Sequence, residues 1–194
     1  MNYKHLGNVN FKSIEKIKKY VTDLKKQNPF QSILIPDILA LEFQSELFPS
    51  KFNQIDLKIN HSKIFLTKPG GGHVIHKDGL DKKVALNVAI TCNDEDWVRW
   101  YSEEEIVRNN GKLTILNVKN GHSRNIDIVN YQDINYIEEV HNKEGDVYLV
   151  NTDIYHTFKN NGTKDRIILQ TKFDPNPSIE ELYIRIQETG LNLQ

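Results

Sequence analysis

The residues with the clearest chemical potential are His76 and Asp78, which a single lysine separates. On an extended strand, residues two apart project to the same face, so an imidazole nitrogen and a carboxylate oxygen can reach one metal ion. A His-x-Asp sequence also arises readily by chance, and a polar strand end that runs into a turn explains it equally well. The pair is therefore a candidate metal site that needs further ligands.

The second half of the chain supplies a third candidate ligand and a cation. His156 follows a strand predicted over 146–151, and Arg166 begins an apolar strand predicted over 166–173. A hairpin through 160–162 would place Arg166 near His156. A buried arginine needs an anion, which is either an acidic side chain or a bound carboxylate. Two histidines and one carboxylate are the ligands that hold non-haem Fe(II) and leave coordination positions open.

Short β-rich segments, separated by turn residues, must position these groups. They are predicted over 55–59, 63–68, 73–76, 84–91, 97–101, 112–117, 126–129, 136–141, 146–151 and 166–173. Many short strands without alternating helices favour a sandwich or barrel over a doubly wound sheet. We expect one domain over 1–194, mainly β with flanking helices: a helical N-terminal part over about 10–48, a β core over about 55–173 and a final helix over about 178–189.

The strand predicted over 84–91 has two different faces. Bulky residues alternate with small or polar ones: Val84, Leu86, Val88 and Ile90 against Ala85, Asn87, Ala89 and Thr91. Such alternation indicates either a half-buried strand with one side in solvent, or a wall that leaves room for a small ligand.

Composition excludes several classes of protein. The 194 residues include 25 basic and 26 acidic side chains, a balance that lacks the electrostatic signature of a nucleic-acid binder. No apolar segment is long enough for a membrane span, and the N-terminus lacks the apolar region of a secretion signal. Cys92 is the only cysteine, so an intrachain disulfide and a zinc site made of cysteines are excluded. We expect a cytoplasmic protein that binds neither nucleic acid nor membrane; nothing in the sequence indicates its oligomeric state.

The order and spacing of His76, Asp78, His156 and Arg166 resemble those of the Fe(II)- and 2-oxoglutarate-dependent oxygenases. The resemblance covers roughly 63–173 and includes a proline-glycine turn before the His-x-Asp. Within that superfamily the chain looks most like the aspartyl/asparaginyl and prolyl hydroxylases or the phytanoyl-CoA hydroxylase group. The resemblance implies a double-stranded β-helix, a jelly-roll or cupin-like fold.

The resemblance also implies a reaction. His76, Asp78 and His156 would hold Fe(II), and Arg166 would bind the distal carboxylate of 2-oxoglutarate. With O2, such an enzyme hydroxylates a C–H bond of an amino acid, a protein side chain or a small molecule, and releases succinate and carbon dioxide. Halogenating relatives lack the metal carboxylate, so Asp78 argues for hydroxylation. Because the histidines must be neutral to bind metal, metal affinity is expected to fall below about pH 6.5.

Further positions follow from the same resemblance. Asn87 and Thr91 are candidates for contact with 2-oxoglutarate or substrate. The nucleic-acid demethylases of the superfamily carry a second arginine in the last core strands, where this chain has Gln170 and Lys172.

Two alternatives keep the fold and change the function. A cupin-like metal protein with non-oxidative chemistry has no need for a carboxylate anchor at Arg166. A metal-free jelly roll that acts as a binding module predicts that the three candidate ligands lie apart. His73, three residues before His76, is expected on the opposite face as a loop or surface histidine.

Overall fold

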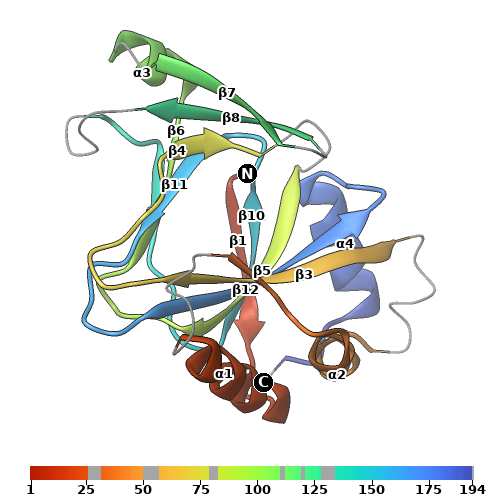
Figure 1. Ribbon diagram of the computed structural model, residues 1–194. Coiled ribbons are helices and arrows are strands. Elements are labelled where there is room, and N and C mark those ends of the chain that lie inside the picture. The colour runs from red at the N-terminus through yellow and green to blue at the C-terminus, as the bar shows by residue number, and fades with distance from the viewer. Residues whose placement is uncertain are drawn as a thin grey trace.

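The computed structural model describes residues 1–25, 32–49, 57–78, 83–109, 112–118, 121–127 and 134–193. Their strands form two antiparallel sheets that face each other (Figure 1). The first sheet has the order β1 (Tyr3–Asn8), β10 (Asp146–Asn151), β5 (Val84–Thr91), β12 (Arg166–Asp174), β3 (Lys58–Thr67) and β2 (Ser32–Leu34). The second has the order β7 (Lys112–Val118), β8 (Gly121–Asp127), β4 (Ile75–Lys77), β11 (Tyr155–Lys159), β6 (Trp97–Tyr101) and β9 (Glu138–Val140).

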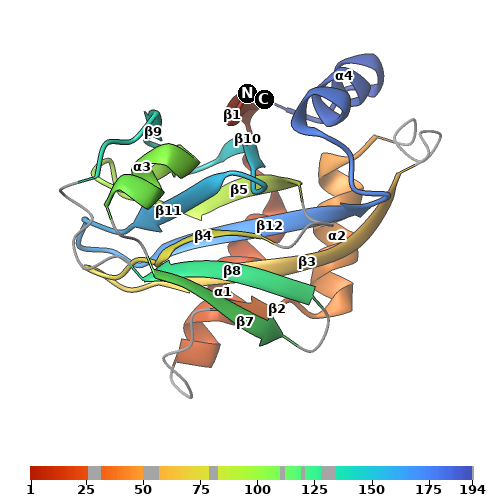
Figure 2. The ribbon, with the colours of Figure 1, turned by 90° about the horizontal axis from the view of Figure 1, so that it is seen from above.

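Helices cover the side of the first sheet that faces away from the second (Figures 1 and 2). They are α1 (Lys12–Lys25), α2 (Asp37–Leu47) and α4 (Ile179–Thr189), whereas the short α3 (Glu103–Arg108) follows β6. The Ser178 hydroxyl accepts a hydrogen bond from the Glu181 amide, and the Glu181 carboxylate accepts one from the Ser178 amide. This capping box, which satisfies otherwise unpaired amides at the helix start, fixes the beginning of the expected C-terminal helix. None of the described helices has the length and apolar character needed to cross a membrane.

The residues of β5 divide the apolar interior into two layers. Its bulky side chains belong to the core between the first sheet and the helices, together with residues such as Phe11, Phe43 and Leu182. Ala85 and Ala89 point the other way and pack between the sheets with Trp100 and Tyr148. Both faces of β5 are therefore buried, so of the two alternatives for this strand the one with a side in solvent is wrong. The small residues leave space between the sheets.

The segment over about 10–48, expected as helical, contains α1 and α2 and also the short strand β2, and a further strand, β1, precedes it. β1 is an edge strand that pairs with β10, and its polar sequence lacks the alternation that predicts a strand. Its place depends on a backbone ladder with a partner about 140 residues away, which no local pattern encodes. The strands expected over 55–59 and 126–129 extend partly outside the described residues.

Candidate metal centre and adjoining cavity

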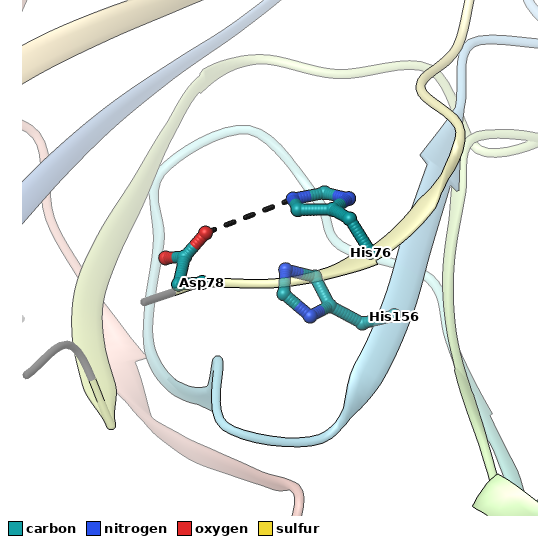
Figure 3. Close-up of side chains that lie close together, drawn as sticks. All are labelled: His76, Asp78 and His156. Carbon is teal, nitrogen blue, oxygen red and sulfur yellow. Dashed lines mark ion pairs between the residues drawn. The ribbon is translucent and has the colours of Figure 1, made fainter. Parts of the chain in front are cut away.

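The pairing of β4 with β11 brings the three candidate ligands together. His76 and His156 are direct partners in this antiparallel ladder, and Asp78 follows β4 immediately. One ligand atom from each of the three side chains lies within 4.8 Å of the other two, and Figure 3 shows the side chains pointing toward one another. This juxtaposition contradicts the metal-free alternative, which required the three residues to lie apart.

The glycine-rich turn before β4 makes this pairing possible. Gly70 has φ +74°, a conformation that suits glycine, and Gly72 forms a bridge with Lys159 of β11. A Cβ atom on Gly72 would lie 2.7 Å from the Phe158 carbonyl oxygen, so a side chain there would push the two segments apart. The absence of side chains therefore lets the backbone before His76 lie directly against β11.

Backbone carbonyls orient both histidine rings. His76 Nδ1 lies 2.9 Å from the Val74 carbonyl oxygen, and His156 Nδ1 lies 2.8 Å from that of Ile154. A carbonyl oxygen can only accept, so Nδ1 carries the proton in each ring and donates it. The lone pair is then on Nε2, which is the arrangement that metal-binding histidines adopt. The backbone therefore presents two neutral imidazole nitrogens to one point.

Asp78 is held by a buried lysine. Lys172 Nζ on β12 donates to Asp78 Oδ2 at 3.0 Å and to Thr152 Oγ1 at 2.9 Å. The Asp78 amide in turn donates to the Thr152 carbonyl oxygen at 2.9 Å. The other carboxylate oxygen, Oδ1, lies 3.7 Å from His76 Nε2 (Figure 3). One oxygen of Asp78 thus faces the histidines while the other is bound to an ammonium group.

Burial and charge keep these groups in the protonation states that metal binding needs. Burial, reinforced by His156 and His73, lowers the pKa of His76 to about 3. Burial also lowers the pKa of His156. Burial alone would raise the pKa of Asp78, but the Lys172 ammonium and the histidines outweigh it and hold that pKa well below its usual range. The onset of weaker metal binding is therefore expected at a lower pH than the value of about 6.5 inferred from free histidine.

Arg166 lies at the start of β12, and its side chain lines the same cavity as the three candidate ligands. Only 3% of the residue is exposed, and its guanidinium lies over the Phe158 ring, with 4.8 Å between Arg166 Cζ and the ring centroid. No carboxylate among the described residues is within ion-pair distance of it. Arg166 is near His156 as expected, but the expected hairpin is wrong: β11 and β12 belong to different sheets, and the segment between them crosses from one to the other.

The cavity has a volume of about 110 Å³ and lies between the two sheets. It is lined by Phe65, His73, His76, Asp78, Asn87, His156, Phe158, Arg166, Ile168 and Gln170. Asn87 is 8% exposed, and its Oδ1 atom has no hydrogen-bond partner among the described residues. A buried polar atom without a partner is costly unless a ligand or water satisfies it. Thr91, the other candidate on β5, lies opposite Ile167 and is not among the lining residues.

Two site residues were not recognised as such from the sequence. His73 was expected on the opposite face from His76, and this is wrong: its ring centroid lies 4.4 Å from that of His76, and the residue lines the cavity. Residue 73 precedes the regular part of β4, so strand alternation does not apply to it. Lys172 stands where the nucleic-acid demethylases carry a second arginine, and the sequence pattern assigned it no role of its own. Its even spacing from Arg166 along one strand was the available signal that both face the same side.

Comparisons with known proteins place this fold. No protein-family model matches the sequence, and no curated protein sequence matches it. Among solved structures, the chain is similar to the epimerase SnoN in complex with Fe3+, alpha ketoglutarate and nogalamycin RO. The TM-score is 0.56 at 8% sequence identity, and the match covers 89% of this chain and 78% of that one. It is also similar to HygX from Streptomyces hygroscopicus with nickel, 2-oxoglutarate and hygromycin B bound, with a TM-score of 0.54, 9% identity, and coverage of 92% and 84%. HygX has also been solved with iron bound.

At these identities the likeness shows the fold alone. The chain has the mainly β, jelly-roll fold of enzymes that depend on iron and 2-oxoglutarate, and the fold expected from the resemblance is confirmed. On that fold, the chain carries a His–Asp–His group of the kind that the resemblance predicts.

Proposed function

We propose that this protein is an Fe(II)- and 2-oxoglutarate-dependent oxygenase that hydroxylates a C–H bond of a small molecule and releases succinate and carbon dioxide. The observation that carries the proposal is a buried arginine without an acidic partner in the described structure, in the same cavity as a His–Asp–His group. Either feature has an ordinary structural explanation by itself. Together they match a metal that is chelated by a ligand with a distant carboxylate.

The donor set fits iron. His76 and His156 offer neutral Nε2 atoms, and Asp78 offers an oxygen atom, which is the two-histidine, one-carboxylate combination typical of non-haem Fe(II). Bound there with 2-oxoglutarate, iron would activate O2 for oxidation of a C–H bond. The protein's own part is to hold the three donors, to orient the ligands and to keep the surroundings dry.

The spacing within the cavity suits 2-oxoglutarate. His156 and Phe158 are two residues apart on β11, about 7 Å along the strand, and both line the cavity. Phe158 supports the guanidinium of Arg166. A dicarboxylate of five carbons spans a similar length. Arg166 would therefore bind the distal carboxylate of 2-oxoglutarate, and His76, Asp78 and His156 would hold the metal that its keto acid end chelates.

The remaining lining residues have separable roles in this proposal. Phe65 and Ile168 supply apolar walls that exclude water around the bound dicarboxylate. The Asn87 side chain, whose Oδ1 lacks a hydrogen-bond partner in the part of the chain that the structure describes, would contact 2-oxoglutarate or the primary substrate. Thr91 is the last residue of β5 and does not line the cavity, so we assign it no direct contact with 2-oxoglutarate or substrate.

A cupin-like protein with non-oxidative chemistry is the nearest competing function. It would use the same three metal ligands but has no role for a buried arginine at the other end of the cavity. Arg166 therefore favours the oxygenase.

The fold matches favour a small-molecule substrate. HygX has been solved with hygromycin B and SnoN with nogalamycin RO, both small molecules. SnoN is an epimerase, so an assay for this protein should detect both an added oxygen atom and a change in configuration.

An anaerobic titration of the metal-free protein with Fe(II) and then 2-oxoglutarate tests the proposal. A saturable, weak visible charge-transfer band of the chelate is expected, and His156→Ala should abolish it. His141→Ala is the matched control, because that histidine is about half exposed and pairs with Glu139 at the surface. Fe(II) binding without the band would favour the cupin-like function, and no Fe(II) binding would refute the metal site.

A further inference from the structure

Lys172 is a charged residue that the proposed reaction does not use. It is only 4% exposed, and it lies on the same strand as Arg166. It is not among the residues that line the cavity, and its ammonium contacts Asp78, which does line the cavity. A lysine is rarely buried to this extent unless its ammonium has partners of matched charge or polarity.

The partners of Lys172 join three segments of the chain. Its ammonium on β12 contacts Asp78, which follows β4, and Thr152, which lies between β10 and β11. Thr152 also accepts the Asp78 amide proton through its carbonyl oxygen. Thr152 therefore holds the backbone amide of Asp78, Lys172 holds its carboxylate Oδ2, and these two residues also contact each other.

The two carboxylate oxygens of Asp78 have different surroundings. Oδ2 is bound by Lys172 at 3.0 Å, whereas Oδ1 faces His76. A carboxylate that is free to rotate can chelate a metal through both oxygens, and it then occupies a coordination position that a keto acid or O2 needs. A charge-assisted hydrogen bond to one oxygen opposes this second mode.

We propose that Lys172 is a positioning residue that restricts Asp78 to one donor oxygen and so keeps coordination positions open for 2-oxoglutarate. The inference rests on the proposed function and adds to it a requirement that the three ligands alone do not explain. Lys172 acts through Asp78 and touches neither the metal nor the co-substrate.

Cobalt(II) binding reports on this directly, because the visible spectrum of Co(II) depends on its coordination number. We would compare the wild-type protein with Lys172→Met, which keeps most of the side-chain length and removes the charge, and with Lys172→Arg, which keeps a cation. Lys164→Met is the control, since Lys164 is an exposed lysine in the segment between β11 and β12. Each protein is titrated with Co(II) and then with 2-oxoglutarate under anaerobic conditions.

The expected result is that Lys172→Met changes the Co(II) spectrum before 2-oxoglutarate is added and weakens 2-oxoglutarate binding by ~10- to 100-fold. Lys172→Arg should restore both properties in part, and Lys164→Met should match the wild type. If Lys172→Met retains the wild-type spectrum and 2-oxoglutarate affinity, the inference is wrong and the lysine only fills the interior.

Two further outcomes are distinguishable. If the wild-type protein itself binds no Co(II), the proposed function fails before the role of Lys172 arises. If Lys172→Met does not fold, Thr152→Val removes one partner of the ammonium and leaves its charge in place. This variant should then show a smaller change of the same kind, and an unchanged Co(II) spectrum with unchanged 2-oxoglutarate affinity would overturn the inference.

Discussion

Replacement of Arg166 by methionine should remove most of the affinity for 2-oxoglutarate without changing the affinity for the metal. The guanidinium is almost completely buried, so solvent does not screen its interaction with a bound carboxylate. Removal of one partner from a buried, hydrogen-bonded charge pair costs about 2–5 kcal/mol. At about 1.4 kcal/mol per factor of ten, the dissociation constant should rise roughly 30-fold to several thousand-fold.

The assay compares two keto acids on the anaerobic Fe(II)-loaded protein, followed by the charge-transfer band. The first is 2-oxoglutarate, and the second is 2-oxobutyrate, which chelates in the same way but lacks the distal carboxylate. The wild-type protein should strongly prefer 2-oxoglutarate, whereas Arg166→Met should bind the two about equally. Arg108→Met serves as the control, because Arg108 is a surface residue of α3 that is more than half exposed.

The comparison isolates the charge pair from other effects of the substitution. A general distortion of the site would weaken both keto acids to a similar extent. If Arg166→Met kept the wild-type preference for 2-oxoglutarate, the buried arginine would not be the carboxylate anchor, and the main argument for the oxygenase over a cupin-like protein would be lost.

Three more predictions concern the metal site and the fold. Asp78→Ala should abolish Fe(II) binding. It should also lower the free energy of unfolding of the metal-free protein in urea by about 3 kcal/mol, because it leaves the Lys172 ammonium buried without its carboxylate partner. The pKa of His76 is lowered to about 3, so between pH 6.5 and about 3 this histidine is protonated in the unfolded chain but neutral in the folded chain. The melting temperature of the metal-free protein should therefore fall from pH 7 to pH 5. The fall should be smaller in His76→Gln. Gly145→Ala should destabilise the protein by about 1–3 kcal/mol in the same urea assay, because φ is +89° and the new Cβ would lie 2.5 Å from Asn8 Oδ1.

Much of the scaffold was predictable because it depends on local patterns. The strands over 84–91, 97–101 and 146–151 have the bounds expected from their apolar residues. The last helix begins at its capping box for the same reason: the residues that satisfy its first amides are neighbours in the sequence. The β1 strand was not predictable, since its ladder with β10 is made between distant segments and its own residues do not alternate.

The candidate ligands were predictable as residue types, and their spacing limited how they could meet. His-x-Asp places two donors on one side of an extended segment whatever lies around it. The position of His73 was not predictable from that rule, because the segment before β4 follows the path of the glycine turn and pairs with β11 instead of continuing a regular strand.

The sequence by itself determined the mainly β architecture, the order of the metal-binding residues and the presence of a cation downstream of His156. These follow from periodicity and residue chemistry, which are properties of short segments. Only the tertiary structure decided that the donors meet within 4.8 Å, that Arg166 is buried without an acidic partner in the described residues, and that Lys172 holds one oxygen of Asp78. The first depends on the pairing of β4 with β11 within the second sheet. The other two depend on the first sheet packing against the second, so that β12 contributes side chains to the same space although it is far from β4 in the chain.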